Sequence, residues 1–385
     1  MNHYTTPRSL TVVVMLCAAC SANTPSKPNE TTKPEARASK SVVTRCQALR
    51  AASMQVTSSE VTFDAAGVTV HGTITAPKQP GRYPAVLLIA GSGPTDRDWR
   101  SPLLPGDNGS AKLLAEGLTA RGVVVLRYDK RASGETAAPE SLTWDDYTAE
   151  QNAGLAALAT REDVAKEAIF AAGHSEGGAH ALRLATRATT PLAGIVLMAT
   201  SGRTLRDVLV WQIHNQLLSA GIPEMQVAAH DDQLGGVLDQ FIGGASVEPT
   251  AASDYPGVQN VVRAFTAPMA VSFARELLGF EPVKAIKEVD VPIFVLHGAK
   301  DIQVDSTRDA EPLRDAAKAA GKDVRFTIYE DADHVFKSEP RPVEELGPQA
   351  GLAYNAPGRE LADGVVADLS AWIDAHGPSP CPPEP

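Results

Sequence analysis

Two short segments early in the chain alternate apolar and polar residues. They span residues 60–64 and 68–75, and the Ala-Ala-Gly stretch at 65–67 between them is typical of a turn. Such a pair predicts an antiparallel hairpin. Six later apolar runs are continuous instead, as expected of strands buried on both faces of a sheet: 85–90, 123–128, 168–172, 194–198, 292–296 and 324–329.

Segments of helical period lie between most of these runs, at 111–121, 147–160, 178–187 and 310–320. Buried strands that alternate with helices predict an α/β fold, with a mostly parallel, twisted sheet and helices on both faces. In such sheets the active site lies beyond the carboxyl ends of the strands. A final helix is expected over about 358–376, packed back on the sheet.

One interval, at about 204–286, contains no convincing buried strand. It shows helical patches, for example at 205–218 and 261–278, which predict a helical cap inserted where a substrate would enter. Extra helices on the flank of the sheet are the alternative. If the interval is an inserted cap, the sheet domain consists of residues 46–203 and 287–380.

The amino terminus has the pattern of an export signal. Arg8 precedes an apolar run, 10–19, that is too short to span a bilayer. The run ends in Leu-Cys-Ala-Ala-Cys-Ser at 16–21, which resembles a bacterial lipobox and implies a lipoprotein signal over 1–20 and a lipid anchor on Cys20 in a bacterial membrane. Ordinary signal-peptidase cleavage, giving a periplasmic or secreted protein, is the alternative. Residues 21–45, rich in polar residues and proline, predict a flexible tether.

Composition narrows the choice of partners. The 385 residues are 43% hydrophobic and 21% charged, as in a globular protein, and the net charge is -11. That charge argues against nucleic acid, because phosphate binding needs clustered cations. After export, Cys46 and Cys381 could form a disulfide that joins the two ends of the domain.

The segment after the apolar run 168–172 carries a nucleophile motif. It contains Gly173-His-Ser175-Glu-Gly177, a G-x-S-x-G pattern between a predicted strand and a predicted helix. A sharp strand-to-helix turn lifts the serine hydroxyl above the sheet edge. The backbone is so close there that positions two before and two after the serine favour glycine. An inert serine in a glycine-rich turn is the alternative.

A serine nucleophile needs a base and an acid, which follow this motif in the order acid, then histidine. Asp301 lies in the turn after the run 292–296, and His334 follows the run 324–329. Asp305 competes for the role of acid but has the pattern of a helix N-cap. His297 is expected to pack or hydrogen-bond in its own turn. Ser175, Asp301 and His334 are therefore the predicted catalytic triad.

An oxyanion hole requires two backbone amides near the nucleophile. The amide of Glu176, directly after the serine, should supply one. The glycine-rich loop 91–98 should supply the other, from Ser92. We expect the charged residues of that loop to brace it through ion pairs, with substrate contact as the alternative; the residues concerned are Asp96, Arg97 and Asp98, with partners among Arg127, Asp129 and Lys130.

Three motifs together resemble a known family. They are the elbow Gly-His-Ser-Glu-Gly-Gly, the loop Gly-Ser-Gly-Pro-Thr-Asp-Arg-Asp and the segment Leu-Arg-Tyr-Asp-Lys-Arg at 126–131. They resemble a bacterial carboxylesterase branch of the α/β-hydrolase superfamily, akin to prolyl-oligopeptidase and dienelactone-hydrolase-like esterases. The resemblance covers about 61–372 and implies the α/β-hydrolase fold. Relatives usually have glycine where this chain has Ala132.

The expected function is hydrolysis of small carboxylic esters, with a short acyl chain, through an acyl-enzyme. A peptidase, aminopeptidase or thioesterase on the same triad is an alternative, and so is a non-catalytic surface binding protein on a hydrolase scaffold. The sequence has no H-E-x-x-H, no paired C-x-x-C and no phosphate or dinucleotide loop. Neither a metal nor a cofactor is therefore predicted.

Overall fold

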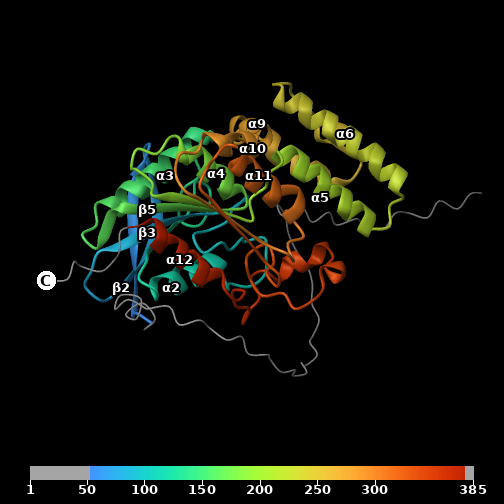
Figure 1. The fold of residues 1–385 in the computed structure, drawn as a ribbon. Helices are drawn as coiled ribbons and strands as arrows, with labels where there is room; N and C mark the ends of the chain where they lie inside the picture. The colour runs from blue at the N-terminus through green and yellow to red at the C-terminus, as the bar shows by residue number, and fades with distance from the viewer. Residues whose placement is uncertain (1–52, 378–385) are drawn as a thin grey trace, which may run out of the picture.

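The structure, a computed structural model, describes residues 53–377. Its centre is an eight-stranded sheet in the order β1-β2-β4-β3-β5-β6-β7-β8 (Figure 1). Strands β1 (Val56–Ala65) and β2 (Val68–Pro77) form the predicted antiparallel hairpin, and β2 runs antiparallel to β4. All pairs from β4 to β8 are parallel.

The six strands of the parallel part are the six continuous apolar runs of the sequence. They are β3 (Tyr83–Ile89), β4 (Val124–Tyr128), β5 (Val164–His174), β6 (Gly194–Met198), β7 (Ile293–Gly298) and β8 (Val324–Tyr329). Every residue of β3, β4, β6 and β7 is buried, because helices cover both sides of the sheet. The predicted α/β architecture is confirmed.

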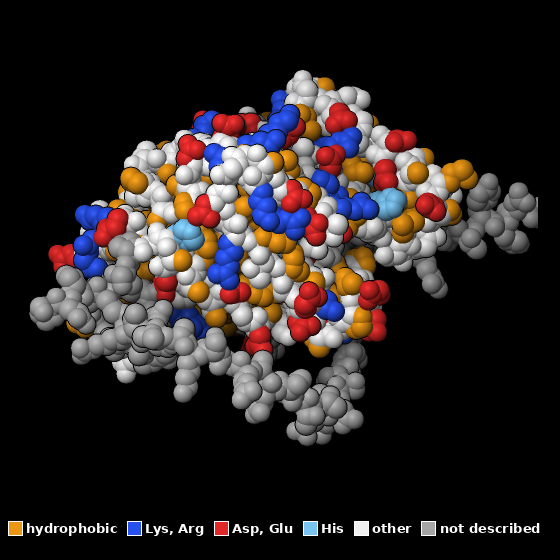
Figure 2. Space-filling view, viewed as in Figure 1, with side chains coloured by type: hydrophobic (Ala, Val, Ile, Leu, Met, Phe, Trp, Pro, Cys, Tyr) orange, Lys and Arg blue, Asp and Glu red, His pale blue; other side chains and the backbone are white. Residues whose placement is uncertain are grey.

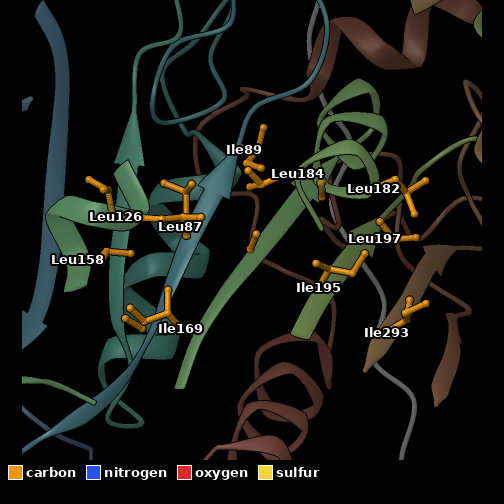
Figure 3. Packing of buried hydrophobic residues seen from close by; sticks show 14 of the residues in the cluster. Leu87, Ile89, Leu126, Leu158, Ile169, Leu182, Leu184, Ile195, Leu197 and Ile293 are labelled. Atoms are coloured by element: carbon orange, nitrogen blue, oxygen red, sulfur yellow. The ribbon is translucent and has the colours of Figure 1, made fainter. Parts of the chain in front are cut away.

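Different helices cover the two faces. One face packs against α3 (Trp144–Ala159), α4 (Glu176–Ala185) and α11 (Glu311–Ala319). The other packs against α2 (Ser110–Thr119) and α12 (Val365–His376). Leu87 and Leu88 of β3 belong to opposite clusters, since successive side chains of a strand point to opposite faces. Figure 3 shows the first cluster, with Leu87, Ile169 and Ile195 from three strands.

Helices make up the interval 204–286. Its described residues form no strand and include α5 (Leu205–Ser219), α6 (Glu224–Ile242), α7 (Pro249–Ala252), α8 (Pro256–Thr266), α9 (Val271–Leu278) and α10 (Pro282–Ala285). Residues of α5, α6, α8 and α9 build a hydrophobic cluster of their own. In Figure 1, α5 and α6 project beyond the sheet domain. We refer to residues 204–286 as the cap.

Two helix predictions are wrong in their bounds. The patch 261–278 is two helices, because Pro268 restricts Ala267 to an extended conformation (ψ 137°) and ends α8. The last helix begins at Val365, not near Gly358, because the chain at Leu361 pairs with Lys337 in an isolated bridge. Gly364, with φ of 89°, then turns the chain into α12.

The remaining helical turns lie around the strand ends and are short. They are η1 (Ile286–Glu288), the π-turn η2 (Ser306–Ala310), η3 (Val343–Glu345) and η4 (Pro348–Ala353). The Asp305 side chain accepts a hydrogen bond from the Arg308 amide at 2.8 Å and caps η2. Asp305 is thus an N-cap, as its sequence context indicated.

Candidate active site

Ser175 lies at the sharp turn between β5 and α4. Strand β5 ends at His174, and α4 begins at Glu176. Between them Ser175 has φ of 55° and ψ of −120°, a conformation that non-glycine residues rarely adopt. The Ser175 amide donates to the carbonyl of Met198 on the neighbouring strand at 2.8 Å, which supports the strained turn.

The glycines around Ser175 are required by close backbone contacts. A Cβ added at Gly173 would lie 1.9 Å from the carbonyl oxygen of Gly177. One added at Gly177 would lie 2.4 Å from the carbonyl oxygen of Ile89. The G-x-S-x-G spacing therefore follows from the geometry of a turn packed against β3.

Asp301 and His334 meet beyond the ends of β7 and β8. Asp301 Oδ2 lies 2.7 Å from His334 Nδ1. The other carboxylate oxygen, Oδ1, accepts from the amides of Gln303 at 2.7 Å and Val304 at 3.0 Å. Burial alone would raise the pKa of the Asp301 carboxyl, but His334 and His297 outweigh burial and hold that pKa well below its usual range. Asp301 is thus a buried carboxylate.

His297 is a second neighbour of this carboxylate. Its Nε2 lies 2.8 Å from the Val304 carbonyl oxygen and 3.3 Å from Asp301 Oδ2. Burial tends to lower the pKa of His297, but Asp301 outweighs it, and the net shift is upward. His297 hydrogen-bonds in its own turn, as expected, and helps to hold Asp301 in place.

His174 contacts the predicted base, which sequence reasoning did not foresee. Its Nε2 lies 2.8 Å from the His334 carbonyl oxygen, and its ring stacks on Trp99 at 4.6 Å between centroids. Burial first, and then the neighbouring His334, lower the pKa of His174 to about 3. A neutral His174 that donates to the His334 backbone fixes the loop carrying that histidine. Because 160 residues separate the pair, no local pattern could reveal it.

Four of the predicted site residues line one cavity of about 140 Å³. Ser175 and His334 are among them, together with Ser92 and Glu176 from the predicted oxyanion hole. Asp301 lies behind His334 and does not line this cavity. The cap contributes mainly apolar side chains to its wall: Leu205, Val208, Leu209, Phe265, Leu277 and Phe280. The cavity therefore brings the predicted nucleophile and the predicted base together with an apolar wall.

The loop 91–98 is braced by ion pairs, as predicted. The Arg97 guanidinium donates to Asp129 Oδ2 at 2.7 Å, and Asp98 pairs with Arg127. Arg97 and Arg127 side chains are 11% and 5% exposed, so these pairs are largely shielded from solvent. Ala132 adopts φ of 62°, a left-handed conformation that glycine adopts more readily than alanine.

Several predictions lie outside the described residues: the signal over 1–20, the tether 21–45, Cys20, and the pair Cys46 and Cys381. Within 53–377, no group of three or more His, Cys, Asp or Glu side chains could hold a metal ion. No helix in that range combines the length and the apolar character needed to cross a bilayer.

The fold and the turn at Ser175 define an α/β hydrolase. A model of the family described as serine aminopeptidase, S33, matches residues 108–341, and the chain belongs to this family. It is 27% identical over 315 residues to esterase EstD of Thermotoga maritima, covering 81% of this chain and 68% of that protein. The α/β hydrolase GrgF from Penicillium sp. sh18 has a similar fold, with a TM-score of 0.50, 13% identity and coverage of 83% and 99%.

The predicted superfamily is therefore confirmed, and so is the predicted class of enzyme, a carboxylesterase-type hydrolase. The family match spans the elbow, the segment with Asp301 and the loop with His334. It does not reach the loop 91–98 or the hairpin β1–β2.

Proposed function

We propose that the protein is a serine hydrolase that cleaves carboxylic esters with a short acyl chain. Ser175 would be the nucleophile, His334 the base, and Asp301 the group that orients the base. The main support is the 2.7 Å contact of His334 Nδ1 with Asp301, together with the cavity that His334 and Ser175 share. Such a contact leaves Nε2 of the imidazole as the atom that can accept a proton.

The reaction would proceed in two halves. His334 Nε2 takes the proton of Ser175 as its oxygen attacks the ester carbonyl carbon, and the amides of Ser92 and Glu176 stabilise the oxyanion. The carbonyl re-forms, and the alcohol leaves with the proton from His334. Water then attacks the acyl-enzyme with His334 as base, which releases the carboxylic acid and restores the Ser175 hydroxyl.

The residues around the cavity favour an ester over a peptide with a free amino terminus. An aminopeptidase must bind an ammonium group, which calls for an unpaired carboxylate near the nucleophile. Glu176 is the one carboxylate residue among the described residues that line the cavity, and Lys130 and His180 already lie 3.5 Å from its Oε1. The curated relative EstD is named as an esterase, which agrees with this choice.

The dimensions of the cavity favour a short acyl group. Its volume of about 140 Å³ is close to the size of engineered cavities that hold a benzene-sized molecule. Leu209 and Phe265 from the cap contribute to its apolar wall, so a small apolar acyl chain would gain most from burial there.

We also propose that the protein is exported and held at a bacterial membrane by lipid on Cys20. The apolar run 10–19, which ends in the lipobox-like Leu-Cys-Ala-Ala-Cys at 16–20, supports this proposal. In that oxidising environment Cys46 and Cys381 would be the candidates for a disulfide.

The decisive experiment compares substrates and one variant. The purified protein should hydrolyse short-chain nitrophenyl esters faster than long-chain esters and much faster than an aminoacyl anilide. Ser175→Ala should abolish this activity and the labelling by a fluorophosphonate probe, with the circular dichroism spectrum unchanged. Preference for the anilide would overturn the esterase proposal. A folded wild-type protein that neither hydrolyses esters nor reacts with the probe would indicate a binding protein instead.

A further inference from the structure

Lys130 lies in the turn after β4, next to both predicted donors of the oxyanion hole. Its side chain is only 7% exposed. The Lys130 Nζ atom donates to the carbonyl oxygen of Gly91 at 2.5 Å and lies 3.5 Å from Glu176 Oε1. A buried lysine is unusual unless it is paired. Here one partner, Glu176, belongs to the elbow, and the other, Gly91, belongs to the loop 91–98.

The contact with Gly91 acts directly on the amide of Ser92. The Gly91 carbonyl and the Ser92 N–H belong to the same planar peptide group, and the described residues contain no cis peptide. In a trans peptide the two groups point in opposite directions, so a cation that holds the oxygen also fixes the direction of the N–H. Positive charge at the oxygen further polarises the peptide and makes its N–H a stronger donor.

Lys130 also contacts Glu176, whose backbone amide is the second predicted donor of the oxyanion hole. His180 Nε2 lies 3.5 Å from Glu176 Oε1, the same oxygen that Lys130 approaches. Trp144 Nε1 donates to His180 Nδ1 at 2.8 Å, which leaves the proton on Nε2, facing Glu176. Burial would raise the pKa of the Glu176 carboxyl, but Lys130, His180 and Ser92 together lower it to about 2. Glu176 is thus ionised and balances the lysine charge.

We propose that Lys130 is a positioning residue of the oxyanion hole, which aligns and polarises the Ser92 amide through the Gly91 carbonyl and anchors Glu176 beside it. The inference rests on the proposed function, because it presumes an oxyanion at this place. Lys130 is not among the residues lining the cavity, so it acts through the peptide group and does not touch the substrate.

The test is Lys130→Met, which keeps the length of the side chain and removes its charge and donors. Loss of a whole oxyanion donor costs about 10²- to 10³-fold in kcat. A misaligned donor should therefore lower kcat by about 10- to 100-fold, with little change in KM. The affinity for a trifluoromethyl ketone, which forms an oxyanion with the enzyme, should fall by the same factor as kcat. The affinity for the product acid should not change.

Lys337→Met is the matched control. Lys337 is a second buried lysine, and its ammonium donates to the carbonyls of Asn108 and Tyr354, which lie outside the loop 91–98. Its loss should lower the melting temperature, and kcat per folded molecule should stay near the wild-type value. If Lys130→Met does not fold, Lys130→Gln retains one neutral donor for Gly91, and kcat should then fall by about tenfold.

Each outcome separates this inference from the proposed function. An active wild type, an inactive Ser175→Ala and a folded Lys130→Met with unchanged kcat would overturn the role of Lys130 alone. The same conclusion would follow if kcat fell while inhibitor affinity stayed constant. If the wild-type protein hydrolysed no ester, the proposed function would fail first.

Discussion

The carboxylate of Asp301 accepts hydrogen bonds on both of its oxygens. His334 Nδ1 approaches Oδ2, and the amides of Gln303 and Val304 donate to Oδ1. Since both amides can only donate, Oδ1 must remain an acceptor. A substitution can therefore replace Oδ2, the atom facing His334, while Oδ1 keeps the two hydrogen bonds that hold the turn. This makes Asp301 the residue at which orientation of the imidazole can be tested separately from folding.

We predict that Asp301→Asn lowers kcat by a factor on the order of 10³ to 10⁴. The asparagine oxygen would keep the two amide bonds and turn its NH2 group toward His334 Nδ1. That nitrogen would then have to accept, and Nε2 would carry the proton and could not take one from Ser175. Steady-state kinetics on a short ester, with circular dichroism as the check on folding, measures the effect.

Asp305→Asn is the control for this prediction. It makes the same chemical change four residues away, at the N-cap of η2, and asparagine caps helices about as well as aspartate. Activity and stability should therefore stay near the wild-type values. Equal losses of kcat in the two variants would refute the special role of Asp301.

At the scale of the element, the turn between β5 and α4 depends on close contact between backbone segments. Gly173 faces the carbonyl of Gly177, and Gly177 faces β3 at Ile89. Backbone atoms in a buried sheet cannot move aside as a side chain can. The strained φ of Ser175 is retained because packing on both sides leaves the chain no other path.

Gly173→Ala should destabilise the protein by about 3 kcal/mol or more, because its Cβ would lie 1.9 Å from a backbone oxygen. Gly236→Ala, in the exposed interior of α6, is the matched control, since a Cβ there meets no atom within 4 Å. It should stabilise the protein by up to about 1 kcal/mol. Urea unfolding of both variants measures the two effects. A Gly173→Ala protein as stable as the control would disprove the crowding described for this turn.

At the scale of the whole molecule, the cap and the sheet domain are joined beside the candidate active site. The buried carboxylate of Asp309 in η2 accepts from the amides of Gly202 and Arg203 and from the Arg203 guanidinium, at 2.6–3.2 Å. It therefore connects the chain that enters the cap to the segment following Asp301.

Figure 2 shows acidic and basic side chains interspersed over the visible face of the described residues.

The net charge of -11 bears on the proposed lipid anchor. Anionic bilayers attract basic surfaces, so a chain with this charge gains no general electrostatic attraction to them. We predict that Cys20→Ala moves the expressed full-length protein from the membrane fraction to the soluble fraction of the cell envelope or medium. Fractionation with an ester assay, and the intact mass of the wild-type protein, would test this. Retention of Cys20→Ala in the membrane fraction would rule out the anchor.

Much of this architecture was predictable from local patterns in the sequence. Strands, hairpin and elbow depend on residues within about ten positions of each other, and their periodicity reports which faces are buried. Ser175, Asp301 and His334 could be proposed because each directly follows a buried run, and parallel strands end at one edge of a sheet. Helical periodicity alone did not separate α8 from α9, although Pro268 in the sequence indicates the break between them.

Only the tertiary structure decided which buried side chains contact the backbone of the candidate site. His174 meets the His334 backbone across 160 residues, and Lys130 meets Gly91 across 39. The contact of Lys130 depends on the pairing of β4 with β3. The contact of His174 depends on the loop after β8, which lies three strands away from β5 in the sheet. Neither contact leaves a periodic signal in the chain. Sequence patterns therefore determined the elements and the candidate chemistry. Packing between distant segments determined the cavity, the partners of each charge and the beginning of α12.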